Sequence, residues 1–409
     1  MAVYIIGTLD TKGAEIAFVR SLIAEQNVSV RVIDAGCQGE PPFAADVPSD
    51  AVFQAAGTTL EEMRRLADRG RAVTEAARGA AVLIRKLFEA GEVDGVIGLG
   101  GSAGTTIATA AMRALPIGVP KLMASTLASG QVRPYVGDKD ILMLNTVVDI
   151  SGINRISRLV LGEAARAMAG MVLLRRAGSA DPTAAGKPDK PLVAATMFGV
   201  TTPCVERARR VLEEAGYEVL VFHATGTGGQ AMESLIADGL IAGVLDITTT
   251  ELADELVGGV LTAGPDRLTA AGKRGIPQVI SVGATDMVNF GTRESVPDKF
   301  RDRLFYQHNA TVTLMRTTPE ENAKLGEEIG RKAAAGSGPV SILLPLKGVS
   351  AIDREGQTFD DPAARTALFN SIRKNHGQAE LIELDQHIND AEFADRAAKR
   401  LIEMLRTRT

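Results

Sequence analysis

A cluster of glycine and hydroxyl residues is the first feature of this chain that points to chemistry. The segment GVIGLGGSAGTT, residues 95–106, reads as a buried strand that runs into a glycine-rich turn and then into a helix. Such a turn leaves backbone N–H groups free at a helix N-terminus, where the helix dipole also favours an anion. The alternative is a tight turn whose glycines only allow close packing. On the first interpretation a phosphate lies on Gly100, Gly101, Ser102, Gly104, Thr105 and Thr106.

The spacing of these glycines narrows the class of ligand. A Walker loop requires a lysine directly after its last glycine, and Thr105 stands there instead. The dinucleotide fingerprint fits poorly because, counting from Gly98, its third glycine comes one residue late, at Gly104. No carboxylate stands near Lys121, where a ribose-binding acid is expected. The sequence therefore favours a mononucleotide or another anion over NAD.

Two further loops are expected at the same edge of a parallel sheet. Gly7, Thr8, Asp10 and Lys12 follow the first predicted strand, and Ser125 and Thr126 follow a later one. Lys12 could reach a terminal phosphate as a point charge, and Asp10 could bind Mg²⁺ directly or through water. Asp10 also suits an ordinary helix N-cap, and the two roles can coexist. Because the carboxyl ends of parallel strands meet at one edge, the three loops together predict a phosphate site.

The chain is organised as two similar halves. Strand-length apolar runs alternate with helical patterns throughout, which predicts βαβ units and mainly parallel sheets. Residues 3–36 and 192–226 share one pattern of strand, helix and strand, and residues 93–106 are echoed by residues 241–254. The segment AGSADPTAAGKPDKP, residues 177–191, lacks apolar periodicity and contains helix breakers. We therefore expect two Rossmann-like α/β domains related by internal duplication, at residues 1–178 and 190–409.

Composition excludes several classes of function. The formal net charge is −5 with both signs well mixed, aromatic residues make up 4%, and tryptophan is absent, so nucleic-acid binding is not expected. No apolar run is long enough to cross a bilayer, and no signal-peptide pattern precedes the first strand. Cys37 and Cys204 are too far apart in sequence to form a metal or redox motif. We expect a cytoplasmic protein with no membrane partner.

The second half carries polar loops whose chemistry is less specific. His223 closes a predicted strand, and Asp353 lies in the polar loop of residues 350–361. We expect His223 to act as a general base in a cleft between the domains. The loop of residues 350–361 contributes to the same cleft, with Asp353 as a further catalytic residue. The alternative is that His223 only hydrogen-bonds to a neighbouring loop. Where the first half has its glycine loop, the second half carries the acids Asp246, Glu251 and Asp254, which suit the start of a helix.

Several longer segments carry a family resemblance. GTLDTKGAE, GLGGSAGTT, PKLMASTLASG and NTVVDISGINRIS resemble the tomato mosaic virus resistance protein-like family of ATP-binding proteins from plants and bacteria, and FGVTTP, HNATVTLMRTT and GVSAIDREGQTFDDPAA extend the resemblance to the second half. The resemblance implies two Rossmann-like domains, a homodimer, and ATP bound with Mg²⁺ in the first domain. The plant protein continues into a TIM-barrel-like domain, which suggests a TIM-barrel-like protein partner for this chain.

Three functions remain open at this point. The leading hypothesis is an ATP-dependent enzyme that hydrolyses ATP or transfers its phosphoryl group to a small polar metabolite, with Lys12, His223 and Asp353 as the catalytic residues. The first alternative is a non-catalytic, ATP-regulated protein-binding module. The second is a dinucleotide-dependent dehydrogenase, which the glycine spacing disfavours.

Overall fold

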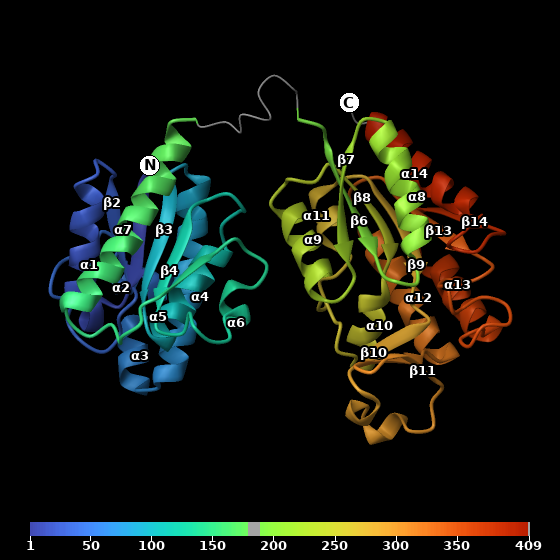
Figure 1. The fold of residues 1–409 in the computed structure, drawn as a ribbon, viewed down its shortest axis with the longest axis horizontal. Coiled ribbons are helices and arrows are strands. Elements are labelled where there is room, and N and C mark those ends of the chain that lie inside the picture. The colour runs from blue at the N-terminus through green and yellow to red at the C-terminus, as the bar shows by residue number, and fades with distance from the viewer. Residues whose placement is uncertain (179–188, 408–409) are drawn as a thin grey trace. The chain divides into compact units, whose positions relative to one another are not determined.

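The computed structural model describes residues 1–178 and 189–407. The chain forms two compact units, here called unit 1 (Met1–Lys187) and unit 2 (Pro188–Thr409). Each unit is an α/β sandwich built on its own parallel sheet (Figure 1). The expected linker falls mainly on residues 179–188, which lie outside the described residues.

Unit 1 contains a five-stranded parallel sheet in the order β2-β1-β3-β4-β5. The strands are β1 (Ala2–Gly7), β2 (Val30–Asp34), β3 (Val93–Gly100), β4 (Lys121–Ser125) and β5 (Leu142–Asn145). Every residue of β1 and β3 is buried, as expected for central strands covered on both faces. Helices α1 (Leu9–Ala24) and α7 (Arg155–Arg176) share one hydrophobic core with the sheet. A second core is formed with α2 (Ser49–Ala55), α3 (Leu60–Leu66), α4 (Arg69–Glu89) and α5 (Ser102–Arg113), and the short α6 (Arg133–Val136) follows β4.

Unit 2 contains a six-stranded parallel sheet in the order β14-β13-β9-β8-β6-β7. Its strands are β6 (Leu192–Met197), β7 (Glu218–His223), β8 (Gly243–Thr248), β9 (Gln278–Gly283), β13 (Val340–Pro345) and β14 (Glu380–Leu384). Helices α8 (Thr202–Glu214) and α14 (Ala391–Arg406) pack on one face of this sheet. The other cores involve α9 (Thr227–Ala237), α10 (Thr250–Val257), α11 (Ala270–Arg274), α12 (Pro319–Ala334) and α13 (Pro362–Asn375).

A small antiparallel sheet interrupts unit 2. It has the order β10-β12-β11 and consists of β10 (Met287–Phe290), β11 (Phe305–Asn309) and β12 (Val312–Arg316). Two 3₁₀ turns, η1 (Arg293–Ser295) and η2 (Asp298–Phe300), connect β10 to β11. The alternation of Thr and Val in the segment HNATVTLMRTT predicts a strand, but the segment instead contains the turn between β11 and β12. This antiparallel addition is not anticipated from the alternating strand and helix pattern.

The two units repeat one topology. The strand order β2-β1-β3-β4 of unit 1 recurs as β7-β6-β8-β9 in unit 2, with the same sequence of crossovers. The expected fold class, two Rossmann-like α/β domains with mainly parallel sheets, is therefore confirmed. In the described ranges 1–178 and 189–407, none of the helices is both long enough and apolar enough to cross a membrane.

Candidate functional site

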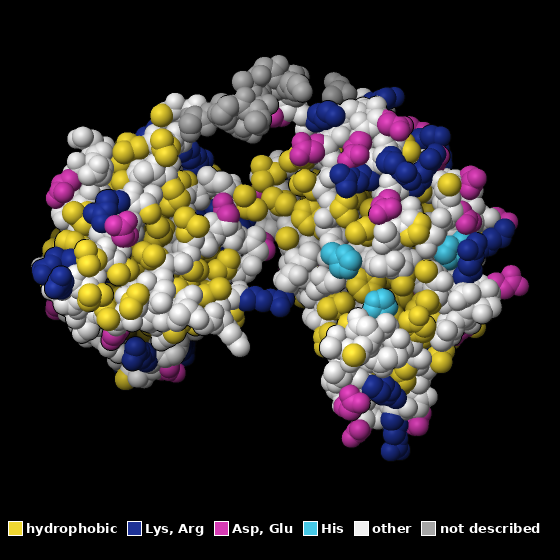
Figure 2. All heavy atoms as spheres, in the orientation of Figure 1, with side chains coloured by type: hydrophobic (Ala, Val, Ile, Leu, Met, Phe, Trp, Pro, Cys, Tyr) yellow, Lys and Arg dark blue, Asp and Glu magenta, His cyan; other side chains and the backbone are white. Residues whose placement is uncertain are grey.

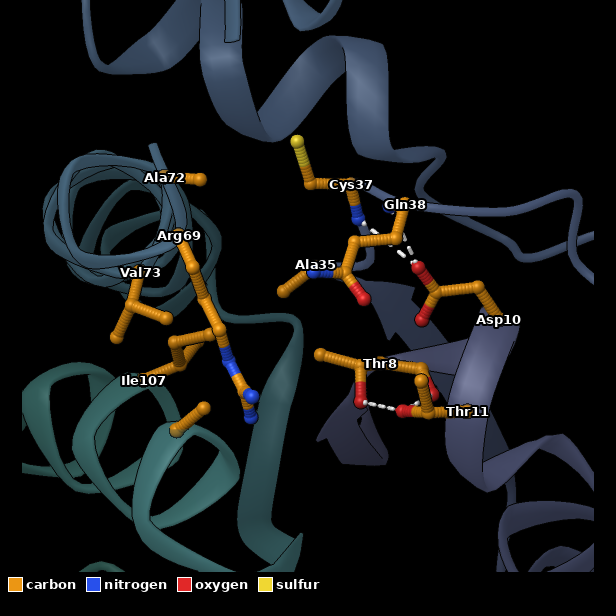
Figure 3. Close-up of a pocket in the computed structure, with 11 residues that line it drawn as sticks. Thr8, Asp10, Thr11, Ala35, Cys37, Gln38, Arg69, Ala72, Val73 and Ile107 are labelled. Atoms are coloured by element: carbon orange, nitrogen blue, oxygen red, sulfur yellow. Dashed lines mark hydrogen bonds between the residues drawn. The ribbon is translucent and has the colours of Figure 1, made fainter. Parts of the chain in front are cut away.

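A pocket with a cavity volume of about 80 Å³ lies at the carboxyl edge of the sheet in unit 1 (Figure 3). The chain leaves the adjacent strands β1 and β3 toward opposite faces of the sheet here, which is the place where open α/β sheets bind ligands. The lining residues come from the ends of β1 and β2 and from helices α1, α4 and α5: Thr8, Asp10, Thr11, Ala35, Cys37, Gln38, Arg69, Ala72, Val73, Ala103 and Ile107.

Three glycines next to this pocket serve close packing. A Cβ atom at Gly98 would lie 2.3 Å from Cβ of Ala108, and one at Gly104 would lie 2.8 Å from the carbonyl oxygen of Leu99. Gly100 has φ +155° and a would-be Cβ 2.9 Å from Cα of Gly104. Only glycine allows α5 to approach β3 this closely. At these positions the glycines therefore serve the close packing given above as the alternative to phosphate binding.

Gly101 differs from its neighbours. A Cβ atom there would meet only Oγ1 of Thr126, at 3.6 Å. Gly101 is the N-cap of α5 and, having no side chain, leaves the first turn of that helix without a side-chain cap. Ser102 is exposed at the helix start, and Ala103 lines the pocket. This end of α5 therefore retains the free backbone donors that an anion requires.

Two of the predicted ligand groups are fully buried. Oγ1 of Thr105 donates to the carbonyl oxygen of Gly101 at 2.8 Å and lies 2.7 Å from Oγ of Ser125, and both residues have no exposed surface. Gly7 is also buried, and its would-be Cβ lies 2.7 Å from Cδ1 of Ile16. These three residues shape the edge of the sheet without facing the pocket. The predicted residues with accessible atoms near this edge are Thr8, Asp10, Lys12, Gly101, Ser102, Thr106 and Thr126.

Asp10 holds the loop that follows β2. Its Oδ2 accepts hydrogen bonds from the backbone N–H groups of Cys37, Gln38 and Gly39, at 3.1, 2.8 and 3.1 Å. Its Oδ1 is buried and has no hydrogen-bond partner. In Figure 3 this second oxygen turns toward Thr8 and the interior of the pocket. One carboxylate oxygen thus organises the loop while the other stays available.

Arg69 supplies a positive charge that the sequence analysis did not identify. Its side chain extends from the start of α4 into the space between Ile107 and Thr8 (Figure 3). Within residues 1–178 and 189–407, its guanidinium has no ion pair or hydrogen bond. The sequence predicts one long helical region over residues 59–90, but the chain breaks it at Ala67, which has φ +50°. Asp68 then caps α4 by accepting from the N–H of Arg71, a signal the sequence did contain.

A second, contiguous hollow of about 340 Å³ extends the pocket along α3 and α4. The two share Cys37, Gln38, Arg69 and Ala72. Arg64 fixes this part of the loop by donating to the carbonyl oxygens of Cys37 and Gly39. Burial raises the pKa of the Cys37 thiol, so the thiol is neutral near pH 7. The groove as a whole combines an apolar wall with a charged rim, on which Arg64 and Arg69 lie near Asp10 and Asp68.

Lys12 contacts a different part of unit 1. Its ammonium group donates to the carbonyl oxygen of Ile150, in the segment that precedes α7. Glu15, one turn further along α1, accepts from the N–H of Gly152 at 2.6 Å. Lys12 does not line the pocket. In this structure Lys12 anchors residues 150–152 to α1. The sequence had instead predicted that Lys12 reaches a phosphate.

His223 and Asp353 occupy separate environments in unit 2. His223 ends the edge strand β7 and is exposed, and its ring centroid lies 5.5 Å from that of Phe198 with the two planes tilted by 50°. Asp353 is fully buried and pairs with Arg316 at 3.2 Å and with Arg365 at 2.8 Å. Within the described residues no hydrogen bond or ion pair joins the two side chains, and Asp353 is held instead by the guanidinium groups of Arg316 and Arg365. A shared catalytic role for this pair finds no support in the geometry.

The loop that contains Asp353 nevertheless borders an open cavity of about 570 Å³ in unit 2. Its lining is strongly charged and comprises Leu346, Lys347, Arg354, Glu355, Asp360, Pro362, Arg365, His387 and Asp390. His387 is buried, and its Nε2 lies 2.8 Å from the carbonyl oxygen of Ser350. Burial lowers the pKa of His387, so its imidazole is neutral near pH 7.

The carboxyl edge of β8 in unit 2 holds a buried charge network. The guanidinium of Arg267 pairs with Asp246 at 2.6 Å, with Glu251 at 2.6 Å and with Glu233 at 3.3 Å. Burial alone would lower the pKa of Arg267, but the negative charge of Asp246 and its neighbours outweighs burial and holds that pKa well above its usual value. Burial raises the pKa of Glu251 in spite of this partner. In the described parts of the chain, no group of three or more His, Cys, Asp or Glu side chains could hold a metal ion.

Two Rossmann-like units, one of them with a pocket at the switch point of its sheet, define a two-domain α/β protein. Residues 1–177 match the N-terminal domain and residues 190–405 the C-terminal domain of the uncharacterised protein family UPF0261, and the chain belongs to this family. It is 50% identical over 405 residues to a UPF0261 protein of Clostridium tetani, with 98% of each chain covered.

A plant relative is longer. The chain is 43% identical over 420 residues to the ToMV resistance protein Tm-1(GCR237) of Solanum lycopersicum, covering 98% of this chain and 55% of that protein. Among solved structures, UDP-N-acetylglucosamine 2-epimerase from Rickettsia bellii matches 99% of this chain and 96% of its own, at 8% identity and a TM-score of 0.23. A likeness this remote carries no argument about function.

Proposed function

We propose that unit 1 binds ATP together with Mg²⁺ in the pocket at the carboxyl edge of β1 and β3. The observation that carries the proposal is that the uncapped start of α5 and the unpaired guanidinium of Arg69 line one pocket. Both attract a polyanion, and a guanidinium can hold phosphate oxygens bidentately. The apolar side chains of Val73 and Ile107 on the same wall suit a flat purine ring.

Asp10 fits the role expected of a magnesium ligand. Its Oδ1 is buried, unpartnered and turned toward the pocket, so an ion there would satisfy an orphaned acceptor. Mg²⁺ in nucleotide sites usually takes one or two carboxylates and completes its shell with water and phosphate oxygens. A single carboxylate is therefore sufficient. When bound, the ion would neutralise phosphate charge, while Asp10 would keep the loop of residues 37–39 in place.

The test is direct binding of nucleotide to the full chain by titration calorimetry. We expect ATP to bind more tightly with Mg²⁺ than without it, and Arg69→Ala to weaken ATP by at least about tenfold, the loss expected for one charge-assisted contact. Arg65→Ala is the matched control, because Arg65 lies on the same segment outside the pocket. Equal affinity of the Arg69 and Arg65 variants, or no ATP binding at millimolar concentration, would overturn the proposal.

We propose further that the bound nucleotide serves a reaction on a small polar metabolite. The charged cavity of unit 2 supports this. Lys347 and Arg354 on its rim pair with Asp385 at 2.9 Å and with Asp390 at 3.7 Å, and an anionic substrate could take the place of these carboxylates. ATP hydrolysis or phosphoryl transfer would be measured against a panel of metabolites. Turnover stimulated by a metabolite and lost in Arg354→Ala is expected. ATP binding without turnover for any metabolite would favour the ATP-regulated protein-binding module instead.

We also propose that the chain forms a homodimer through unit 1. Hydrophobic side chains gather on the face that α7 covers (Figures 1 and 2), where Leu159 and Leu174 are 59% and 63% exposed. Exposed apolar area of this kind is typical of protein contacts. Light scattering after size exclusion should report a dimer, and Leu159→Asp should give a monomer. Val82→Asp on α4 is the control, since Val82 is exposed on a different helix. A monomeric wild type would refute the proposal.

A further inference from the structure

Helix α7 turns apolar side chains away from its own core (Figures 1 and 2). Leu161 and Met168 are buried and mark the side that packs on the sheet. At about 100° per residue, Leu159, Gly170 and Leu174 fall on the opposite side within about 60° of one another. Both leucines are exposed, although this side of a surface helix normally carries polar residues. We call it the outward face of α7; it consists of Leu159, Glu163, Arg166, Ala167, Gly170 and Leu174.

Nothing within the chain requires glycine at position 170. Gly170 lies in the interior of a 22-residue helix, where glycine is less favourable than any residue except proline. Its backbone does not adopt a positive φ. A Cβ atom there would meet no atom of the described residues within 4 Å. The missing side chain therefore leaves a gap in the outward face that packing inside the chain does not use.

The outward face is symmetrical about its midpoint, which lies between Arg166 and Ala167. Leu159 precedes Arg166 by seven residues, and Leu174 follows Ala167 by seven. If two copies of α7 cross antiparallel at this midpoint, Leu159 of each copy lies against Leu174 of the other. The two exposed leucines of the face therefore complement each other in a pair of identical helices.

The charges near the midpoint fit the same arrangement. Glu163 and Arg166 form an exposed ion pair at 2.6 Å within one chain. Glu163 precedes Arg166 by three residues and Gly170 follows Ala167 by three, so the crossing places Glu163 of each copy against Gly170 of the other. The gap at Gly170 leaves room for the glutamate side chain, which then lies one helical turn from Arg166 of the second copy. Each glutamate can therefore form an ion pair across the contact as well as within its own chain.

The apolar surface extends beyond the outward face. Ile156, in the first turn of α7, is exposed. Leu142 and Leu144 point to the same side of β5, and Leu144 packs in the core that the sheet shares with α7. The exposed Leu142 therefore lies on the α7 side of the sheet. A stable interface buries about 800 Å² on each partner, which is more than one helix face supplies, and these neighbours enlarge the surface.

We infer that two copies of α7 cross antiparallel between Arg166 and Ala167, and that Gly170 is the residue that gives the second copy room to approach. The partner is a second copy of this chain, because the outward face complements itself in both spacing and charge. Such a two-fold contact is isologous, so each pair of residues occurs twice. The inference rests on the proposed homodimer for the presence of the second copy, and it adds the direction, the register and the deciding residue of the contact.

The first test fills the gap at Gly170. Gly170→Leu should leave the fold intact, because the new side chain starts in open space and leucine favours a helix more than glycine does. The melting temperature should therefore not fall. Sedimentation velocity should show that the dissociation constant of the dimer rises by at least about tenfold. Arg158→Leu is the matched control, because it places the same residue at an exposed position of α7 outside the outward face, and it should remain a dimer.

The second test determines the direction of the crossing with a short bismaleimide in a Cys37→Ser background, where the remaining Cys204 is completely buried. Ala167→Cys lies next to the two-fold axis and should crosslink the two copies. Leu174→Cys alone should not, because the two copies of that position lie about 22 Å apart along an antiparallel pair. Leu159→Cys and Leu174→Cys combined in one chain should crosslink, since each then faces the other across the contact.

The outcomes separate this inference from the proposed homodimer. A wild type that is monomeric at every concentration refutes both. A dimeric wild type whose dissociation constant is unchanged in Gly170→Leu leaves the homodimer in place and overturns the inference. Crosslinking of Leu174→Cys to itself also overturns it, because the helices would then be parallel or in a different register. A lower melting temperature in Gly170→Leu would mean that Gly170 serves packing within the chain, which contradicts the inference as well.

Discussion

Oγ1 of Thr105 and Oγ of Ser125 lie 2.7 Å apart, and both side chains are completely buried. The pair joins α5 to the end of β4, the two elements that the sequence analysis expected to present hydroxyl groups to a phosphate. Ser125 also accepts from the N–H of Leu127 at 3.0 Å. The hydroxyl groups of this edge are therefore divided: Thr105 and Ser125 stabilise the turn, while Ser102 and Thr126 keep accessible surface.

Ser125→Ala should lower stability without affecting nucleotide binding. The change leaves the N–H of Leu127 without its acceptor, so the free energy of unfolding should fall by about 1–2 kcal/mol in urea titrations. ATP affinity should stay within about twofold of the wild type. Ser102→Ala is the control with the opposite profile, an effect on nucleotide binding and not on stability. Because Ser102 is exposed, the change should alter the free energy of unfolding by less than about 0.5 kcal/mol. A large loss of ATP affinity in Ser125→Ala would mean that its hydroxyl belongs to the binding site after all.

The glycines of residues 98–104 should separate into two classes. Gly98→Ala places a methyl group 2.3 Å from Cβ of Ala108 and should cost about 1–3 kcal/mol of unfolding free energy. Gly101→Leu meets only Thr126 near its Cβ, so it should leave the fold intact while its side chain blocks the start of α5. ATP affinity should then fall by at least about tenfold. Thermal unfolding and calorimetry on both variants would measure stability and ATP affinity. Unchanged ATP affinity in Gly101→Leu would mean that the turn is not part of the binding site.

The sequence was sufficient for the two parallel sheets, which its alternating strand and helix patterns predicted, but not for the antiparallel sheet of β10, β11 and β12. The glycine and hydroxyl residues after β1, β3 and β4 lie at the edge of the sheet where the pocket is found. The sequence was insufficient where the role of a side chain depends on the residues that it contacts in the fold. The helix break at Ala67, which places Arg69 in the pocket, depends on a left-handed residue that is not glycine. The burial of Asp353 depends on Arg316 and Arg365, which are distant in sequence from each other.

Lys12→Ala should disturb the segment of residues 150–152 more than it weakens nucleotide binding. Because the Lys12 ammonium donates to the carbonyl oxygen of Ile150, its loss should speed amide hydrogen exchange over residues 150–152. ATP and AMP should weaken by the same small factor, since the structure gives Lys12 no place in the pocket. Glu15→Gln, which disturbs the same segment through Gly152, should give a similar exchange pattern. A selective loss of ATP over AMP in Lys12→Ala would instead restore its predicted role at the terminal phosphate.

The stability of unit 2 should depend on pH through Asp254. Burial raises the pKa of its carboxyl from 3.8 to about 7, although the amide of Asn289 donates to it at 2.7 Å. The folded protein therefore holds this proton more tightly than the unfolded chain. The resulting stabilisation is fully present below pH 3.8 and is lost as pH rises through about 7, by up to about 1.4 kcal/mol per pH unit.

Asp254→Asn should remove this dependence and retain the fold. Oδ1 of Asn289 is buried without a partner, so rotation of that amide would let it accept from the amide group that the substitution introduces. In urea titrations from pH 5 to 8, wild-type stability should fall relative to the variant as pH rises. Glu255→Gln, an exposed neighbour on α10, should track the wild type throughout. A constant difference between wild type and Asp254→Asn across this range would mean that Asp254 is ionised at pH 5, and that the hydrogen bonds from Asn289 and Leu261 outweigh its burial.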